Sequence, residues 1–257
     1  MKVVILAGGK GTRISEESRI KPKPMVEIGG RPILWHIMKI YSAFGYRDFI
    51  ICCGYKGHII KDFFTNYYRY QTDSTFDIKE GTSVSHCSNV EPWRVTLADT
   101  GYDTLTAGRI LKIREYIGED DNFMLTYGDG VADINLDDLL AFHKKHGRIA
   151  TITTTQPEGR FGAIKLDDDG MISGFKEKAR KDQSWINAGY MVLNRQIFDY
   201  LGDGSQMLEA APFEDLARDK QMAAYRHPGF WSPMDNVHDR DYLQGLWEQG
   251  HAPWKIW

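Results

Sequence analysis

A cluster of cationic side chains follows a glycine loop close to the start of the chain. Residues 3–25 read VVILAGGKGTRISEESRIKPKPM, in which an apolar strand runs directly into two glycines. Five cations fall within fourteen positions: Lys10, Arg13, Arg19, Lys21 and Lys23. Backbone N–H groups in such a loop are free to bind anions, and glycine allows a close approach to a ligand. A structural turn with scattered surface cations would use the same residues, but Pro22 and Pro24 stiffen the cationic segment, so we favour a phosphate-binding site.

Two common phosphate-binding fingerprints do not fit this loop. The dinucleotide pattern GxGxxG needs a glycine at position 14, which is Ile14. The P-loop pattern needs Ser or Thr after its lysine, whereas Lys10 is followed by Gly11. A dinucleotide-dependent oxidoreductase is therefore disfavoured.

A carboxylate in a second glycine-rich stretch is a candidate metal ligand. Asp129 lies in TYGDG, at the end of a predicted strand, between two glycines that leave space for a metal ion and a substrate. An Asp-Gly pair also forms turns, but Asp129 has no cationic neighbour in the sequence, and a carboxylate is costly to bury without a cation. Since Mg²⁺ prefers carboxylate and phosphate oxygens, we predict that Asp129 binds Mg²⁺.

The composition excludes several classes of protein. The chain has 257 residues and a formal net charge of −3, which is too close to neutral for a surface built to bind nucleic acid. Its apolar start is too short for a secretory signal, and no stretch approaches the roughly 20 apolar residues of a membrane span. Cys52, Cys53 and Cys87 lack metal-binding spacing and predict reduced thiols. We therefore expect a cytoplasmic protein that binds neither membranes nor nucleic acid.

Alternating buried strands and amphipathic helices predict an α/β fold. Strands are expected at 2–7, 48–53, 123–127, 149–155 and 222–226, and helices at 31–45, 57–70, 105–117, 136–146, 195–201, 212–220 and 239–249. We also expect strand pairs around 162–175 and 185–193, and a β-rich excursion at about 71–104. This order predicts a Rossmann-like, mixed but mostly parallel central sheet flanked by helices, with β-rich insertions. We expect one domain over residues 1–257, in which residues 222–257 complete the site and contact other subunits.

The motif LAGGKGTR followed by KPKPM resembles the signature of the sugar-1-phosphate nucleotidyltransferases. The resemblance covers essentially the whole chain, through RPILWHIMKIY, DFIICCGYKG, VEPWRVTLADTG, TYGDGVAD, GRFGAI, INAGYMVLN and PGFWSPMD. It implies a reaction in which a phosphate oxygen of a sugar 1-phosphate attacks the α-phosphorus of a nucleoside triphosphate, and pyrophosphate leaves. Several of these sequence motifs are similar to those of the family branch that uses CTP and glucose 1-phosphate. The resemblance thus implies CDP-glucose synthesis with Mg²⁺ as cofactor, for CDP-linked deoxy-sugars of lipopolysaccharide.

The resemblance also implies roles for individual residues. It implies catalytic roles for Arg13, Lys23 and Asp129, and a magnesium site made of Asp129 and Asp235. The positions expected to bind the nucleotide are Leu6, Ala7, Gly8, Gly9, Gly11, Thr12, Arg13, Lys23, Thr104, Gly108, Arg109, Tyr127 and Gly128. Those expected to bind the sugar phosphate are Glu177, Lys178, Asn187 and Gly189. Because two metal-binding carboxylates repel each other, we predict that Asp129→Asn keeps the fold and gains stability without substrate.

Other functions stay open at this point. Thymidylyl or uridylyl transfer to a sugar 1-phosphate would use the same residues. A non-catalytic, nucleotide-sensing regulatory subunit is a second alternative, although the joint presence of Arg13, Lys23, Asp129 and Asp235 argues against it. The resemblance implies a homo-oligomer with a hexamer as its expected size, and the aromatic ending APWKIW also indicates a partner subunit.

Overall fold

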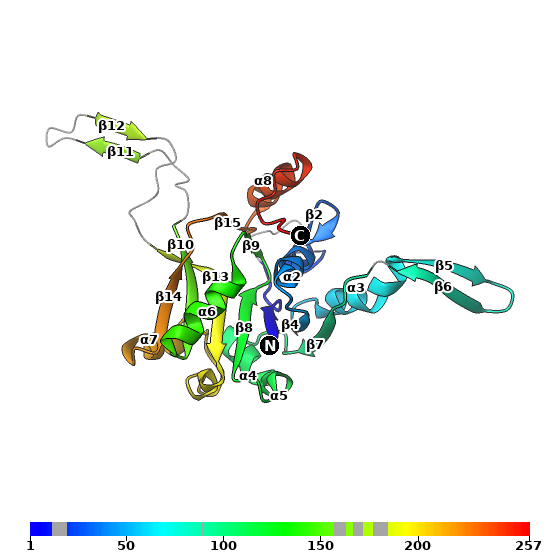
Figure 1. Ribbon diagram of the computed structural model, residues 1–257, viewed down its shortest axis with the longest axis horizontal. Coiled ribbons are helices and arrows are strands. Elements are labelled where there is room, and N and C mark those ends of the chain that lie inside the picture. Colours follow the sequence, from blue (N-terminus) through cyan, green and yellow to red (C-terminus); the bar gives the residue numbers. More distant parts are fainter. Residues whose placement is uncertain (12–19, 89, 157–162, 167–171, 177–184) are drawn as a thin grey trace.

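Helices and strands alternate along the chain (Figure 1). The computed structural model describes residues 1–11, 20–88, 90–156, 163–166, 172–176 and 185–257. The helices are η1 (Lys23–Met25), α2 (Ile33–Ala43), α3 (Gly57–Tyr70), α4 (Thr106–Lys112), α5 (Arg114–Ile117), α6 (Leu136–His146), η2 (Arg195–Asp199), α7 (Ala211–Arg218) and α8 (Val237–Glu248), of which η1 and η2 are 3₁₀ helices. None of the helices in the described ranges has the length and apolarity needed to cross a membrane.

Seven strands form the central sheet. They are β1 (Val3–Leu6), β4 (Asp48–Cys53), β7 (Arg94–Asp99), β8 (Asn122–Tyr127), β10 (Ala150–Thr155), β13 (Ile186–Asn194) and β14 (Met222–Arg226). Their order across the sheet is β14-β10-β13-β8-β1-β4-β7. β13 runs antiparallel to β8 and β10, whereas the other neighbours pair in parallel. The predicted mixed, mostly parallel sheet is confirmed.

The remaining strands form four short two-stranded sheets. These are β2 (Glu27–Ile28) with β3 (Arg31–Pro32), β5 (Thr72–Asp77) with β6 (Thr82–Ser88), β9 (Gly130–Ala132) with β15 (Trp231–Pro233), and β11 (Ala163–Leu166) with β12 (Ile172–Lys176). The β5–β6 hairpin extends beyond α3, away from the central sheet (Figure 1). It exposes three large apolar side chains, Phe76, Ile78 and Val84.

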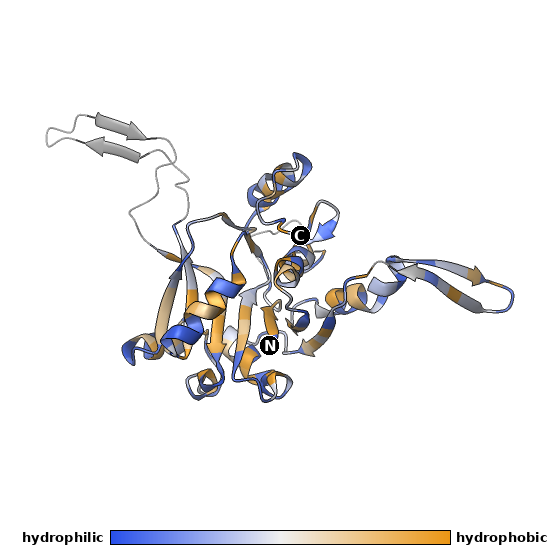
Figure 2. Ribbon diagram, viewed as in Figure 1, coloured by the Kyte–Doolittle hydropathy of each residue, from blue (hydrophilic) through white to orange (hydrophobic). Residues whose placement is uncertain are grey.

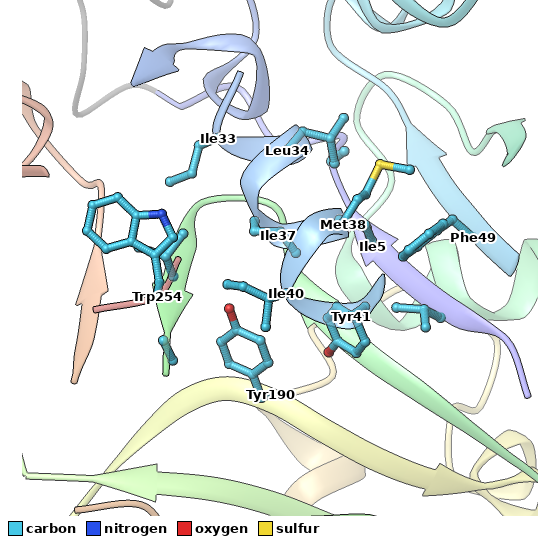
Figure 3. Packing of buried hydrophobic residues seen from close by; sticks show 14 of the residues in the cluster. Ile5, Ile33, Leu34, Ile37, Met38, Ile40, Tyr41, Phe49, Tyr190 and Trp254 are labelled. Atoms are coloured by element: carbon cyan, nitrogen blue, oxygen red, sulfur yellow. The ribbon is translucent and has the colours of Figure 1, made fainter. Parts of the chain in front are cut away.

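Helices cover both faces of the central sheet, which explains why the inner strands β1 and β4 are almost entirely apolar. Successive residues of a strand point to opposite faces, so Val3 and Ile5 join one core cluster while Val4 and Leu6 join the other. The first cluster contains most of α2, which lies across the sheet against Ile5 and Phe49 (Figure 3). The second contains residues of α4, η2 and α7. In Figure 2 the central strands are accordingly mostly hydrophobic, and the helices carry hydrophilic residues as well.

Local signals at α6 explain why its bounds agree with the prediction. Asn135 caps the helix, because its side-chain oxygen accepts from the backbone N–H groups of Asp137 and Asp138, both at 3.1 Å. Gly147 ends it in the left-handed conformation, with φ of 64°, which glycine adopts without strain.

Three predicted segments differ from the structure. Residues 94–99, assigned to the β-rich excursion, form β7, the edge strand that pairs in parallel with β4. The expected helix at 105–117 is interrupted at Ile113, whose φ and ψ of −103° and 7° lie outside the helical range. Around 185–193 there is one long strand, β13, rather than a strand pair.

The aromatic end of the chain packs inside its own domain. Trp254 is fully buried, and its ring lies near those of Phe230 and Trp247 in stacked geometry. Its Nε1–H donates to Nδ1 of His36 at 3.4 Å, while Nε2–H of His36 donates to the carbonyl of Ile28 at 2.8 Å. The core of the same chain therefore covers Trp254, and the expectation that residues 222–257 contact other subunits stays a prediction.

Candidate active site

A cavity of about 490 Å³ opens at the carboxyl ends of β1 and β8. Twelve of the residues expected to bind nucleotide or metal line it: Leu6, Ala7, Gly8, Gly9, Gly11, Lys23, Thr104, Arg109, Tyr127, Gly128, Asp129 and Asp235. After β4 and β7 on one side of β1, the chain crosses to β8 on the other side, and ligands of open α/β sheets bind where the strand order reverses in this way. The cavity therefore lies where the fold itself favours a ligand.

Strand pairing brings the two glycine-rich loops together. Leu6 and Tyr127 are register partners at the ends of β1 and β8, and Gly128 N–H donates to the carbonyl of Leu6 at 3.1 Å. A Cβ on Gly128 would lie 2.9 Å from Cγ of Pro24, so only glycine fits there. The loop after β1, the stiff KPKP segment and the TYGDG motif thus meet in one place.

Lys23 joins the two aspartates that were expected to bind magnesium. Its Nζ lies 2.6 Å from Oδ2 of Asp129 and 2.7 Å from Oδ1 of Asp235. The lysine side chain is 11% exposed, whereas the two carboxylates are 35% and 31% exposed. Burial lowers the pKa of Lys23, but the charges and hydrogen bonds of both aspartates outweigh it and hold that pKa above its ordinary value. One ammonium group therefore pairs with both carboxylates at once.

This contact gives Asp129, which has no cationic neighbour in the sequence, a cation from a distant part of the chain. Lys23 and Asp129 are 106 positions apart, so inspection of neighbours in the sequence could not reveal the pair. Because Asp129 and Asp235 share Lys23, removing the Asp129 charge breaks an ion pair. The predicted gain in stability of Asp129→Asn no longer follows.

Asp235 is positioned from both sides. Pro233 of β15 pairs with Gly130 of β9, and Met234 N–H donates to the carbonyl of Asp129 at 2.8 Å. The backbone N–H of Asp235 donates to Oδ2 of Asp239, in the first turn of α8, at 2.9 Å. The two carboxylates are consequently fixed by backbone contacts and not only by Lys23.

The aspartate pair fits a divalent cation. Two carboxylates already converge on a single positive charge, and Mg²⁺ typically takes one or two protein carboxylates together with water and substrate phosphates. Within the described residues, no group of three or more His, Cys, Asp or Glu side chains could hold a metal ion. A magnesium ion bound here would therefore take its remaining ligands from the substrate and from water.

Arg109 lies in the wall of the cavity and is 4% exposed. Its guanidinium donates to the carbonyls of Gly8, Cys53 and Gly101 at 3.0, 3.2 and 2.9 Å, and to Oγ1 of Thr100 at 2.6 Å. These acceptors and a fifth, the carbonyl of Tyr102 at 3.5 Å, are uncharged, and burial lowers the pKa of Arg109. The side chain thus ties the glycine loop to the ends of β4 and β7, and its predicted contact with the nucleotide stays a prediction.

Gly108 does not line the cavity. A Cβ on Gly108 would lie 2.6 Å from the carbonyl oxygen of Gly204, which packs directly against α4. Thr104, by contrast, lies at the cavity wall, where its Oγ1 accepts from Nζ of Lys112 at 3.3 Å. The structure therefore gives Gly108 a packing role and leaves Thr104 exposed to a ligand.

Asn187 and Gly189, expected at the sugar phosphate, line a smaller pocket of about 40 Å³ beside the cavity. Tyr127 and Asp129 line both spaces. Gly189 has φ of 80°, and a Cβ there would lie 2.6 Å from Cδ2 of Tyr127, so the tyrosine ring rests on the glycine backbone. Thr12, Arg13, Glu177 and Lys178 lie outside the described residues.

Several cavity residues were not predicted. They are Pro24, Leu105, Thr106 and Met207. Pro24 belongs to the quoted KPKP motif, and Leu105 and Thr106 lie between two predicted residues, so proximity in sequence could have indicated them. Met207 follows the turn-forming DGS stretch at 203–205 and carries no motif.

Known proteins resemble this chain in sequence and in fold. Residues 2–236 match the family model described as nucleotidyl transferase. The chain is 52% identical to the glucose-1-phosphate cytidylyltransferase of Salmonella typhi over 257 residues, which cover all of both chains. It is 46% identical to the probable glucose-1-phosphate cytidylyltransferase of Bacillus subtilis, again with all of both chains covered.

Solved structures agree on the fold. HddC from Yersinia pseudotuberculosis aligns with a TM-score of 0.68 at 21% identity, covering 96% of this chain and 99% of that chain. An apo UDP-glucose pyrophosphorylase aligns with a TM-score of 0.68 at 16% identity, covering 97% and 98%. The resemblance deduced from the motifs is confirmed: the chain is an enzyme of the nucleotidyl transferase family, in the branch of the glucose-1-phosphate cytidylyltransferases.

Proposed function

We propose that the chain transfers a cytidylyl group from CTP to α-D-glucose 1-phosphate, giving CDP-glucose and pyrophosphate. The observation that carries the proposal is the meeting of a glycine loop, a buried lysine and two carboxylates in one cavity. Full-length identity of 52% to a protein named for this activity supports the choice of substrates. The attacking group is a phosphate oxygen of the sugar phosphate, so the enzyme needs no nucleophile of its own.

The described residues supply positioning and charge, which are what phosphoryl-type transfer needs most. The backbone of Gly8, Gly9 and Gly11 offers N–H groups and close approach for the triphosphate. Lys23 neutralises phosphate charge, and its buried stem keeps the ammonium at a fixed position. We expect Arg13 to add a second cation at the same loop.

We propose that Asp129 and Asp235 hold Mg²⁺ when the nucleotide is bound. The ion would neutralise the triphosphate and favour departure of pyrophosphate. Lys23 then needs a new anionic partner, and the substrate phosphate provides one. The sugar phosphate is proposed to bind at the smaller pocket, through Asn187 and Gly189, with Glu177 and Lys178.

A panel of substrates tests the proposal. Pyrophosphate release is measured with CTP, UTP, dTTP, ATP and GTP, each paired with glucose, mannose and galactose 1-phosphates in the presence of Mg²⁺. The pair of CTP and glucose 1-phosphate should be fastest, and mass spectrometry should identify CDP-glucose. A clear preference for UTP or dTTP would replace the cytidylyl assignment by the alternative transfer, and a chain that binds nucleotide without turnover would be the regulatory subunit.

Two further expectations belong to the same proposal. CDP-glucose would be the precursor of CDP-linked deoxy-sugars for lipopolysaccharide. Deletion of the gene for this chain in its source organism would test this expectation. The homo-oligomer, with a hexamer as its expected size, stays a prediction that sedimentation velocity can measure. The exposed Phe76, Ile78 and Val84 of the projecting hairpin support association, since they are apolar side chains without cover in a single chain.

A further inference from the structure

The segment that connects η2 to α7 forms part of the cavity wall. Gly204 packs on Gly108, and Met207 lines the cavity. Ala107 N–H donates to the carbonyl of Gln206 at 3.3 Å, which fixes the segment at the start of α4. A stretch without any recognisable motif is therefore built into the site.

The carboxylate of Glu209, at the end of this segment, connects two walls of the cavity. Its Oε2 accepts from Oγ1–H of Thr106, on α4, at 2.9 Å, and its Oε1 accepts from the hydroxyl of Tyr127, at the end of β8. Thr106 Oγ1 in turn accepts from the N–H of Leu208 at 2.7 Å, which closes a small ring of hydrogen bonds. Bonds of this kind to a charged acceptor are stronger than those between neutral groups.

Tyr127 stands between the cavity and the smaller pocket, because it lines both. Its ring rests on the backbone of Gly189, and its hydroxyl accepts from Nδ2 of Asn187 at 3.5 Å. The same hydroxyl donates to Oε1 of Glu209. Glu209 thus fixes the hydroxyl end of a ring whose face is fixed by Gly189.

We propose that Glu209 is a positioning residue for nucleotidyl transfer: it holds Tyr127 as the shared wall of the two pockets, so that the two substrates meet in one fixed arrangement. The inference rests on the proposed function, because it assigns one pocket to each substrate. Small displacements of bound reactants cost large factors in rate, so a carboxylate that touches neither substrate can still control turnover.

Glu209→Gln tests the inference with little change in shape. The amide has a single acceptor oxygen and no charge, so either Thr106 or Tyr127 loses its acceptor. We expect kcat/KM to fall by about tenfold to a hundredfold, the range for one hydrogen bond to a charged group. The KM for the sugar phosphate should rise most, because Asn187 and Gly189 lie on the same wall. Glu214→Gln is the matched control, since Glu214 is exposed on α7, and it should behave as the wild type.

A double-mutant cycle distinguishes positioning from general destabilisation. Tyr127→Phe removes the same hydrogen bond from its other end, so the double variant should be no slower than the slower single variant. Tyr127→Phe also provides the test if Glu209→Gln does not fold. Thr106→Ala keeps the bond to Tyr127 and should cost less than either.

Three results would overturn the inference. The first is that Glu209→Gln has the kinetics of the wild type. The second is that the losses of kcat/KM in the two single variants multiply in the double variant. The third is that Glu209→Gln melts at a lower temperature but keeps the KM and kcat of the wild type. The assays use whichever substrate pair reacts fastest with the wild type. If that pair is not CTP and glucose 1-phosphate, the proposed function fails while the comparison of variants still decides the role of Glu209.

Discussion

Replacing Lys23 by methionine should expose a cation site that the lysine now fills. The methionine keeps most of the buried stem but removes the ammonium that contacts Asp129 and Asp235. Oxygens that share one nitrogen partner lie within about 5 Å of each other, where two unit charges repel by about 3 kcal/mol at an effective dielectric constant of about 20. Both carboxylates are about one-third exposed, so water screens part of this repulsion. We expect the free energy of unfolding to fall by about 1–3 kcal/mol.

Magnesium should reverse this loss in the variant. Without the ammonium, the ion can bind between the two carboxylates in the absence of nucleotide, and a ligand at ten times its Kd stabilises the folded state by about 1.4 kcal/mol. In the wild type, Lys23 competes for the same oxygens, so free Mg²⁺ should raise the melting temperature much less. Each kcal/mol shifts the melting temperature of a chain this size by about 2–4 °C.

The assay is differential scanning calorimetry over a Mg²⁺ titration, with Mn²⁺ binding followed by electron paramagnetic resonance. Lys21→Met is the matched control, because Lys21 lies two positions away and pairs with Glu27 at 2.8 Å instead. Its response to Mg²⁺ should equal that of the wild type. The reasoning is refuted if free Mg²⁺ stabilises the wild type and Lys23→Met equally, or if neither responds.

Three further predictions follow from the same structure. Asp129→Asn should abolish most turnover and also lower the melting temperature, because the amide no longer pairs with Lys23; near-normal activity at low Mg²⁺ would remove Asp129 from the metal site. Gly8→Ala should lose about 1–3 kcal/mol of stability and weaken CTP binding measured by calorimetry, because its Cβ would overlap the Arg109 guanidinium, whereas Gly9→Ala, with nothing within 4 Å, should keep the melting temperature of the wild type. Burial, with a smaller effect from the charge of His146, lowers the pKa of His143 to about 4. As the pH falls, this histidine is protonated in the unfolded chain before it is protonated in the folded chain. Its contribution to the free energy of unfolding should therefore be complete above about pH 6.5 and be lost toward pH 4. Urea titrations should show a shallower fall for His143→Asn.

Motifs that are local in sequence allowed much of the site to be predicted. LAGGKGTR and TYGDG each end a buried strand, and parallel strands place such ends at one edge of a sheet, so their residues meet in the cavity. The cationic residues of the first motif predicted an anion site, and the carboxylate of the second predicted a metal site. What they could not predict is which charges pair, because Lys23 and Asp235 are 212 positions apart.

The parts that were missed depend on tertiary packing. The alternation in WRVTL placed residues 94–99 in the β-rich excursion. They form β7, an edge strand of the central sheet, which pairs with β4 on one side and is free to carry polar residues on the other. Residues 204–209 have no periodicity or motif, and they reach the site through tertiary contacts such as those of Gly204 with Gly108 and of Gln206 with Ala107. The packing partners of Trp254, which are Trp247 and Phe230, could not be predicted because they depend on how the end of the chain returns to α2.

The contacts of Arg109 also restrict how this enzyme can change in evolution or in the laboratory. One guanidinium fills the space that a side chain at Gly8 or Gly54 would need, and a Cβ on Gly54 would lie 2.5 Å from its Nη1. A lineage that enlarges either glycine first meets a clash, and one that shortens Arg109 first loses the hydrogen bonds that tie the glycine loop to the ends of β4 and β7. Each single substitution is therefore expected to lower the stability of the fold, so the three positions should change together. Libraries that aim to reshape the loop have to randomise them together.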